Sequence, residues 1–380
     1  MKIINHLKKD AVLYIALVLA ILSSIVIRPS FEVIVSAIDW RVLSLLFCLM
    51  AVVVSFRKYN VLDVIAVSLI RKCTNMRMLY ITLLLLVFFV SMAVTNDVAL
   101  LTFVPLTLII CTKADIEPVF LIILETLAAN LGSCVTPMGN PQNLYLYSFY
   151  TMGSASFFSN TLLIGLPSLI MLICSVFFVT RKTKKTIAVT IQHISLESPV
   201  KIVLNTIVLV IILLSVFRII DYKVSLVTTA VYLLICERTL FTKIDYSLLF
   251  TFIGFFIFTK NLSQISAISS FLRKMLGTEF SVYLSGIGVS QVISNVPAAL
   301  LLSGFTSYSE SLLLGVNTGG LGTLIASLAS VISYKLYTAD QALHPAVKSK
   351  HSYLAAFTFL NIIFLILLIP LVWVLKIILL

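Results

Sequence analysis

The chain has 380 residues, of which 60% are hydrophobic and only 11% charged, and its mean hydropathy is +1.13. A soluble domain is about 45–50% apolar, so this composition excludes an ordinary soluble protein and predicts an all-α polytopic membrane protein. The net charge of +12 does not indicate nucleic-acid binding, because the basic residues lie in loops between apolar runs. Basic loops are the orientation signal of a membrane protein.

Apolar runs and loop charges together predict a topology with the N-terminus inside. The first run, 11–27, follows a basic flank, and we interpret it as a span because no small-residue cleavage site with a soluble chain follows. Most of the 27 Lys and Arg then lie on the inner side. The remaining uninterrupted spans are predicted at 40–56, 157–180, 202–220, 224–236, 248–259 and 353–374.

Four further apolar segments are interrupted by polar residues. The segments 78–112 and 280–305 are too long for one span and are broken at "VTND" and "ISNV". We expect two re-entrant hairpins there, the first entering from inside and the second from outside. The segments 117–147 and 312–336 are expected to be broken helices, because Pro, Gly and Asn interrupt them. Irregular backbone in a bilayer is tolerated only where it is buried in protein or lines a cavity.

The interruptions recur in the same order in the two halves of the chain. The stretch "NLGSCVT" at 130–136 returns as "NTGGLGT" at 317–323, with Asn, Gly and Thr at the same positions, and "VTND" is echoed by "ISNV". The charge map makes the two copies run in opposite directions, which predicts an inverted repeat of the kind found in secondary transporters. The predicted organisation is one membrane domain with a first repeat at 1–180, a cytoplasmic linker at 181–200 and a second repeat at 201–380.

Two of the fifteen acidic residues are expected at membrane depth. Asp97 lies at the first hairpin tip, and Glu125 lies in the helix that leads into the first break. Ionisable groups at this depth are costly and are typical of ion pathways. No Lys or Arg lies near them in the sequence at that depth, so Asp97 is predicted to bind a coupling ion or a proton. Three interpretations are open for Glu125. It binds a coupling ion or a proton, it hydrogen-bonds the hairpin and holds it closed, or it is a structural acid that is protonated or satisfied locally.

The candidate coupling-ion and substrate-binding residues share these interruptions, where broken helix ends and neutral Asn, Thr and Ser groups suit ions. For each residue the alternative is a packing kink or an interhelical hydrogen bond. Four polar interruptions at repeat-related positions favour a site. The candidates are Thr95, Asn96, Asp97, Glu125, Asn130, Gly132, Thr136, Gly139, Asn140, Asn143, Ser294, Asn295, Asn317, Thr318, Gly319, Thr323 and Ser327.

The sequence does not favour an enzyme. It shows no nucleophile–base pair, metal-ligand cluster or nucleotide-binding loop at membrane depth. The six Cys are scattered without a CxxC pair, and the four His lie in loops or at segment ends. No cofactor is predicted beyond a sodium ion or a proton as the coupling ion.

The interrupted segments resemble one known family. The stretches "TNDVALLTFVPLTL" (95–108), "NLGSCVTPMGNPQN" (130–143), "SNVPAALLL" (294–302) and "NTGGLGTLIASLAS" (317–330) resemble the ion transporter superfamily. The similarity is to its arsenite permease and NhaD-type sodium–proton antiporter branch, with the divalent anion–sodium symporters and citrate carriers as relatives. The resemblance implies an elevator-type transporter that works as a homodimer.

The resemblance also implies two coupling-ion sites flanking one substrate site. The first tip reads Thr-Asn-Asp, nearer to the arsenite branch, whereas the second reads Ser-Asn-Val-Pro and lacks a third hydroxyl. By motif, the first site takes Thr95, Asn96, Gly132 and Thr136, the second takes Ser294, Asn295, Gly319 and Thr323, and Asn140 and Asn143 line the region between. A sodium ion is expected at Thr95, Asn96 and Gly132 and another at Ser294, Asn295 and Gly319.

The expected function is secondary active transport of a small inorganic or organic anion, coupled to sodium or protons by alternating access. The alternative is a sodium–proton antiporter that moves no anion, since no basic side chain is expected at membrane depth to bind one. The expected location is the cytoplasmic membrane, with the N-terminus in the cytoplasm. The lipid bilayer, a small-ion or small-anion substrate and a second copy of the chain are the expected partners.

Overall fold

The computed structural model describes residues 11–181, 194–343 and 351–380. Residues 182–193 of the expected linker, and the basic residues Lys348 and Lys350 of the inner side, lie outside the described residues. Within the described ranges every regular element is a helix. Seven of these helices are long and apolar enough to cross a membrane, which confirms the prediction of an all-α polytopic membrane protein.

The helices are grouped by their place along the chain. The first group is α2 (Ala11–Ile27), α3 (Phe31–Ala37), α4 (Trp40–Lys58), α5 (Val61–Ile70), α6 (Met76–Val94), α7 (Asn96–Ala114), α8 (Val119–Ser133), α9 (Pro141–Phe149) and α10 (Ser154–Val179). The second group is α11 (Pro199–Val216), α12 (Tyr222–Cys236), η1 (Arg238–Lys243), α13 (Tyr246–Ser263), α14 (Ser266–Met275), α15 (Glu279–Ile293), α16 (Asn295–Ser303), α17 (Ser309–Thr318), η2 (Leu324–Ala326), α18 (Leu328–Leu343) and α19 (Tyr353–Leu379).

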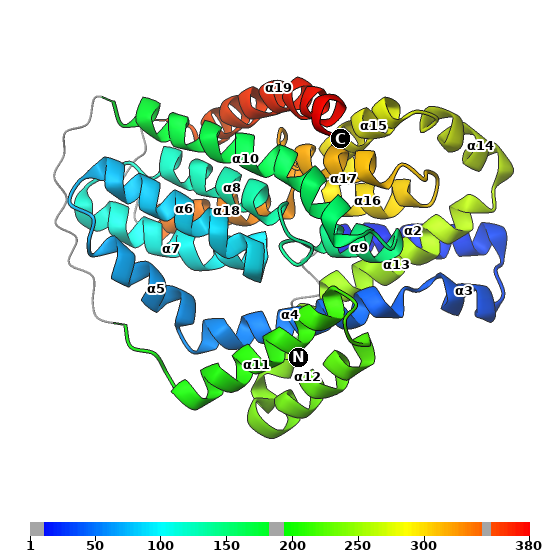
Figure 1. Ribbon diagram of the computed structural model, residues 1–380, viewed down its shortest axis with the longest axis horizontal. Coiled ribbons are helices and arrows are strands. Elements are labelled where there is room, and N and C mark those ends of the chain that lie inside the picture. The colour runs from blue at the N-terminus through cyan, green and yellow to red at the C-terminus, as the bar shows by residue number, and fades with distance from the viewer. Residues whose placement is uncertain (1–10, 182–193, 344–350) are drawn as a thin grey trace.

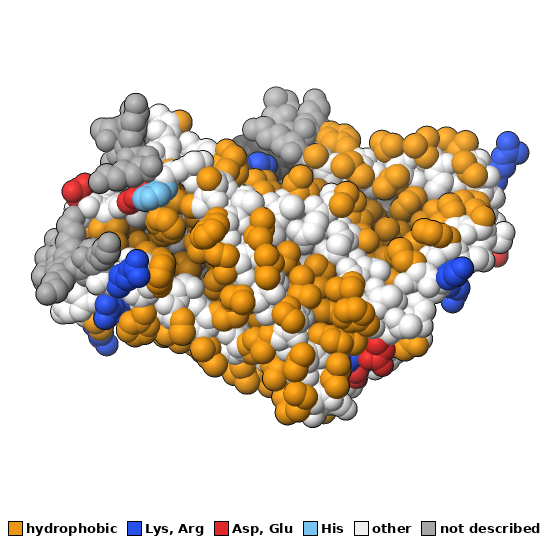
Figure 2. Space-filling model, turned by 90° about the horizontal axis from the view of Figure 1, so that it is seen from above, with side chains coloured by type: hydrophobic (Ala, Val, Ile, Leu, Met, Phe, Trp, Pro, Cys, Tyr) orange, Lys and Arg blue, Asp and Glu red, His pale blue; other side chains and the backbone are white. Residues whose placement is uncertain are grey.

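The molecule is elongated, and its helices run mostly along its length (Figure 1). Helices α5 to α8 and α18 fill the left half of the view, while α15, α16 and α17 lie in the right half with α2, α3, α13 and α14. Hydrophobic side chains cover much of the face in Figure 2, and most of the charged side chains lie along its edges and toward its two ends. This distribution is the one that a bilayer requires around the middle of a spanning protein.

Two hydrophobic cores hold the helices together. One core centres on α6, α7 and α8, with large buried side chains such as Tyr80, Phe88 and Phe103, and it reaches α18 and α19. The other core joins α4, α12, α13 and α16 around Phe252 and Phe305. Because lipid is as apolar as these side chains, close packing rather than hydrophobic burial selects the neighbours of each helix.

All four predicted interruptions appear as helix ends. The segment expected at 78–112 is α6 and α7, which meet at Thr95, and the segment expected at 280–305 is α15 and α16, which meet at Ser294. The expected broken helices are α8 with α9, and α17 with η2 and α18. Helices α3, α5 and α14 lie between the predicted spans and were not expected from hydropathy, because each is too short to cross a membrane.

Candidate functional site

The two hairpin tips have the same backbone geometry. Thr95 between α6 and α7 has φ 80° and ψ 149°, and Ser294 between α15 and α16 has φ 74° and ψ 154°. A positive φ is uncommon for a residue with a branched or polar side chain and carries strain. Each tip is followed at once by an Asn, Asn96 or Asn295, that begins the next helix. The tips therefore turn the N-terminal ends of α7 and α16 into the protein interior.

Asn143 bonds the irregular backbone that interrupts the first broken helix. Its side-chain Nδ2 donates to the carbonyl oxygens of Cys134 at 2.8 Å and Thr136 at 3.1 Å. Asn140 is the N-cap of α9 and accepts from the backbone N–H of Asn143 at 2.9 Å. Pro141 takes the first helical position, where its missing N–H removes no hydrogen bond. Buried polar backbone needs such partners, so Asn143 stabilises the irregular segment between α8 and α9.

The second broken helix is held in the same way by Gln291 of α15. Its Nε2 donates to the carbonyl oxygens of Gly319 at 2.8 Å and Leu321 at 2.9 Å. Its Oε1 accepts from the backbone N–H of Thr323 at 2.9 Å, and the Thr323 hydroxyl donates to the Gln291 carbonyl at 3.0 Å. A single amide side chain thus bonds the start and the end of the irregular segment between α17 and η2.

Four helices begin at one small pocket beside the tips. The pocket lies where the N-terminal ends of α7, α9, α16 and α18 meet, and Leu248 of α13 closes it. Its volume is about 10 Å³, which is room for about one water molecule. The pocket is lined by Asn96, Asp97, Pro141, Gln142, Leu248, Asn295, Val296, Ser327 and Leu328.

Positive helix ends and an acidic side chain act together in the pocket. Helix N-termini carry partial positive charge and unpaired backbone N–H groups, and they bind anions. Gln142 is only 2% exposed, yet its amide has no hydrogen-bond partner among the described residues, so it is free to face a ligand. The Asp97 carboxylate is half-buried and likewise makes no hydrogen bond within the described ranges. Asp245, the N-cap of α13, lies close enough to repel it.

Asparagine side chains join the two halves of the chain behind the pocket. Asn130 accepts at Oδ1 from Asn96 at 3.1 Å and from Ser327 at 2.9 Å, and its Nδ2 donates to Ser330 at 3.3 Å. Asn317, its counterpart in the second half, donates to Asn143 Oδ1 at 2.7 Å. Asn317 also accepts from Asn140 Nδ2 at 3.3 Å. Each of these two Asn residues therefore contacts the broken helix of the other half.

Glu125 lies outside the pocket, deep in α8 and fully buried. Its Oε1 accepts from the hydroxyl of Thr107 on α7 at 2.5 Å, and its Oε2 has no hydrogen-bond partner in the described part of the chain. This contact joins α8 to α7 of the first hairpin, which is the hydrogen bond that one of the three interpretations of Glu125 described.

The remaining candidates lie behind the pocket lining. A side chain at Gly132 would strike the backbone of α6 at Phe88, and a side chain at Gly139 would strike the carbonyl of Ser133. The Thr136 hydroxyl donates to the Met92 carbonyl at 2.5 Å. Thr318 and Gly319 end α17 in the buried interior. The structure therefore brings Asn96, Asp97, Asn295 and Ser327 into the pocket lining and leaves the other candidates outside it.

Sequence reasoning missed Gln142 and Leu248 of the pocket, and also Gln291, whose amide bonds the backbone of the second broken helix. Gln142 stands in "GNPQN", so the Pro that precedes it could have indicated a residue in the first turn of a helix inside the break. Gln291 lies just before the second tip in "SQVISNV". Leu248 carried no signal, because its place at the pocket depends on how α13 packs against the tips.

The fold defines a polytopic helical membrane protein. The family model described as "Citrate transporter" matches residues 2–310, so the chain belongs to this family of membrane transporters. It is 33% identical over 304 residues to an uncharacterized transporter of Methanocaldococcus jannaschii, covering 79% of this chain and 81% of the relative. It is 31% identical over 307 residues to the inner membrane protein YbiR of Escherichia coli, with the same two coverages. A Dictyostelium discoideum protein named as transporter arsB is 26% identical over 139 residues, 37% of this chain and 24% of the relative.

Proposed function

We propose that the protein is a secondary active transporter that moves a small inorganic or organic anion across the cytoplasmic membrane. The observation that carries this proposal is the pocket where α7, α9, α16 and α18 begin. Four positive helix ends and the unpartnered amide of Gln142 offer hydrogen-bond donors to an anion without any basic side chain. The family's description as citrate transporters agrees with an anionic cargo.

Alternating access is the mechanism that we propose for the movement. The pocket has room for about one water molecule, so a larger anion requires the tips to separate from the broken helices. The matching tip geometry at Thr95 and Ser294 supports an inverted repeat of 1–180 and 201–380. In this proposal the hairpins and broken helices slide as an elevator against the remaining helices.

Sodium or protons are the coupling ions that we propose. The proposed sodium sites lie at Thr95, Asn96 and Gly132 and at Ser294, Asn295 and Gly319. Asp97 is the proposed proton acceptor, because its carboxylate lies in the pocket without a hydrogen bond to the described residues. A bound proton or sodium ion would remove the repulsion between this carboxylate and an incoming anion.

A sodium–proton antiporter that moves no anion is the second candidate function. It is favoured by one observation, which is that no Lys or Arg lines the pocket, while an acidic side chain does. In this case the Asp97 carboxylate itself occupies the positive helix ends and exchanges a proton for a sodium ion. We further propose that the protein acts as a homodimer with its N-terminus in the cytoplasm.

Thermal unfolding of the full chain in detergent tests the coupling ion. Sodium is titrated against potassium at several pH values, because a ligand that binds the native state raises the midpoint temperature. A sodium-dependent rise that Asn96→Ala removes supports the sodium site. A pH-dependent rise that Asp97→Asn removes supports proton coupling. Asn361→Ala is the matched control, because this buried amide donates only to Phe357 in its own helix.

The same assay distinguishes the two candidate functions. Citrate, succinate, sulfate and phosphate are added at the sodium concentration and pH that stabilise the protein most. A further rise with one anion, followed by uptake of that anion into liposomes, supports the anion transporter. Sodium–proton exchange in liposomes without any anion effect supports the antiporter. If neither cations, pH nor anions change the midpoint, the proposed function is wrong.

A further inference from the structure

Helices α2 and α13 form a tightly packed pair that ends at one end of the molecule. Gly254 of α13 lies against the backbone of Ala16, where an added Cβ would come within 3.0 Å of the Ala16 carbonyl. Farther along, Asn261 Nδ2 donates to the hydroxyl of Ser24 at 2.9 Å. The order of these two contacts shows that α2 and α13 run in the same direction. Their C-terminal ends therefore lie together, beside α3 (Figure 1).

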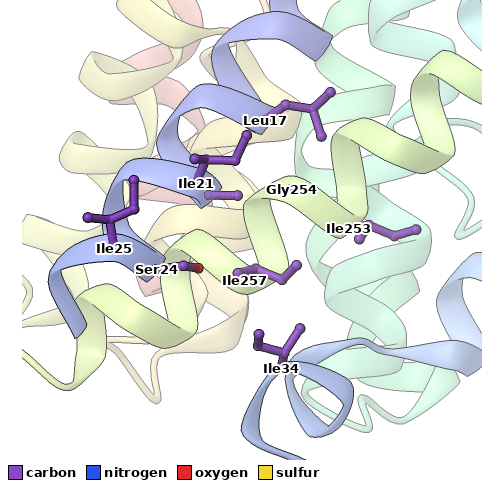
Figure 3. A pocket seen from close by; sticks show the side chains of 9 residues that line it. Leu17, Ile21, Ser24, Ile25, Ile34, Ile253, Gly254 and Ile257 are labelled. Atoms are coloured by element: carbon purple, nitrogen blue, oxygen red, sulfur yellow. The ribbon is translucent and has the colours of Figure 1, made fainter. Parts of the chain in front are cut away.

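A groove of about 390 Å³ opens between these helices, away from the candidate transport site. Figure 3 shows Leu17, Ile21 and Ile25 on one wall, Ile253 and Ile257 on the other, and Ile34 of α3 across the end. The only polar side chain in the lining is Ser24, which already accepts from Asn261. A volume of this size falls in the range of small-molecule sites, and the lining suits a hydrocarbon chain.

Two cationic residues lie just beyond the residues that line the groove: Arg28 directly follows α2, where its φ of 52° ends the helix, and Lys260 lies on α13. Arg28 follows Ser24 by four residues, and its backbone N–H still donates to the Ser24 carbonyl at 2.8 Å. Lys260 follows Ile257 by three residues on α13, so it extends the same face of that helix. Both side chains are exposed, and neither makes a hydrogen bond or ion pair with the described residues. The acid nearest in sequence to the groove lining is Glu32, on the first turn of α3.

Helix α14 places this end of the molecule at the height of lipid headgroups. It starts at Ser266, just after α13 ends, and none of its residues is buried. Phe271 is 66% exposed, and Arg273 and Lys274 stand in the last turn. A short helix with one apolar face and basic ends is typical of the membrane interface. Arg28 and Lys260 therefore lie where phosphate groups are available.

We propose that the groove between α2, α3 and α13 binds one anionic phospholipid. One acyl chain lies along Leu17, Ile21 and Ile257, and the phosphate pairs with Arg28 and Lys260. A second copy of the chain fits this surface less well, because a two-fold contact brings the same patch of both copies together. Such a contact would gather four cationic side chains, Arg28 and Lys260 of each copy, at one interface. The site holds α2 to α13 and is independent of the proposed transport function.

Lipid binding to the full chain tests the site. The purified protein is stripped with detergent, and phosphatidylglycerol or phosphatidylcholine is added back while bound lipid is counted by native mass spectrometry. We expect one phosphatidylglycerol to be retained in preference to phosphatidylcholine. Arg28→Ala and Lys260→Ala should each weaken this preference about fivefold, since a basic side chain near the surface contributes about 1 kcal/mol toward anionic lipid.

Two further variants separate the groove from general surface charge. Arg273→Ala with Lys274→Ala removes two positive charges from α14, one more than either single variant, and should still leave the retained phosphatidylglycerol unchanged. Ile21→Trp narrows the groove and should release the lipid although both cations remain. Equal retention of the two lipids, or a loss in the α14 variant as large as in the Arg28 and Lys260 variants, overturns the proposal. So does an Ile21→Trp protein that changes from dimer to monomer in nanodiscs while it keeps its lipid.

Discussion

Gly132 allows α8 to pack directly against the backbone of α6. An added Cβ would overlap the Phe88 carbonyl of α6 and come within 2.7 Å of the Ser91 hydroxyl. The clash is with backbone, which cannot rotate away, so Gly132→Ala should lower stability by about 1–3 kcal/mol. The measurement is the thermal midpoint of the detergent-purified protein. Gly288→Ala is the control, because the space around that glycine of α15 is open within 4 Å. Equal thermal midpoints for Gly132→Ala and Gly288→Ala would contradict the close contact between α6 and α8.

Gln142 and Gln291 provide a matched pair with opposite expected effects. Gln142 has no hydrogen-bond partner among the described residues, so Gln142→Leu should leave the thermal midpoint nearly unchanged. Losing one hydrogen bond of about 1 kcal/mol to an anion should weaken its binding about fivefold. Gln291→Leu strands the carbonyls of Gly319 and Leu321, at about 1–3 kcal/mol for each unpaired group.

The measurement is the thermal midpoint of Gln142→Leu and of Gln291→Leu, each with and without an added anion. We expect a lower midpoint with Gln291→Leu and a smaller anion shift with Gln142→Leu. A large loss of stability in Gln142→Leu would mean that its amide bonds the protein rather than a ligand. The sequence could predict neither role, because a Gln beside a break looks the same whether it bonds backbone or faces a pocket. Asn130 and Asn317 were predictable as a pair, since their motif recurs with the same spacing.

At the scale of elements, Glu237 holds three helices together at one end of the molecule. Its buried carboxylate follows α12 and accepts from Lys58 and Tyr59 at the end of α4, and from Lys201 of α11 at 2.8 Å. Glu237→Gln leaves two lysines without their counter-charge. A broken buried pair costs about 3–5 kcal/mol, but the two lysine side chains are 32% and 39% exposed. Solvent therefore reduces the expected loss to about 1–3 kcal/mol.

Glu197→Gln is the control for this prediction. Glu197 is an exposed acid that accepts a single hydrogen bond from Asn60 at 3.2 Å. Its replacement should change the thermal midpoint by little, because an exposed contact contributes at most about 1 kcal/mol. Chemical denaturation at low and high salt adds a second readout. If the cluster is electrostatic, the difference between Glu237→Gln and native protein should shrink as salt rises. An unchanged difference would assign the loss to packing instead.

Hydropathy predicted the long elements well and the short ones poorly. The run 11–27 is α2, and its C-terminal end at Ile27 is correct because the apolar residues stop at Arg28 and Pro29. Helix α3 was missed, since it depends on a local cap, where Ser30 accepts from the Val33 N–H at 3.4 Å. The breaks were predictable because Pro, Gly and Asn interrupt apolar runs. The hydrogen bonds by which Asn143 and Gln291 hold the irregular backbone depend on tertiary contacts, so no periodic pattern in the sequence predicts them.

At the scale of the whole molecule, the sequence predicted a repeat but not which helices pack together. The two hydrophobic cores divide the helices by contact rather than by order, so α9 packs with α4 and α16 while α8 packs with α6 and α18. Lipid-facing and buried surfaces are equally apolar in this chain, so composition cannot tell which face of a helix meets another helix. The convergence of four helix starts at the pocket follows only from this packing.

The opposite orientation of the two repeats can be tested from the loops that follow the hairpins. Asp115 begins the connection after α7, and Ser307 lies in the connection after α16; both are exposed. If the repeats are inverted, a Cys at position 115 faces the cytoplasm and a Cys at position 307 faces outside. In intact cells, with the six native Cys replaced, an impermeant maleimide should label Ser307→Cys only, and Asp115→Cys should react after the membrane is opened. Labelling of both from the same side would mean that the repeats are parallel, because an inverted pair cannot present both connections to one compartment.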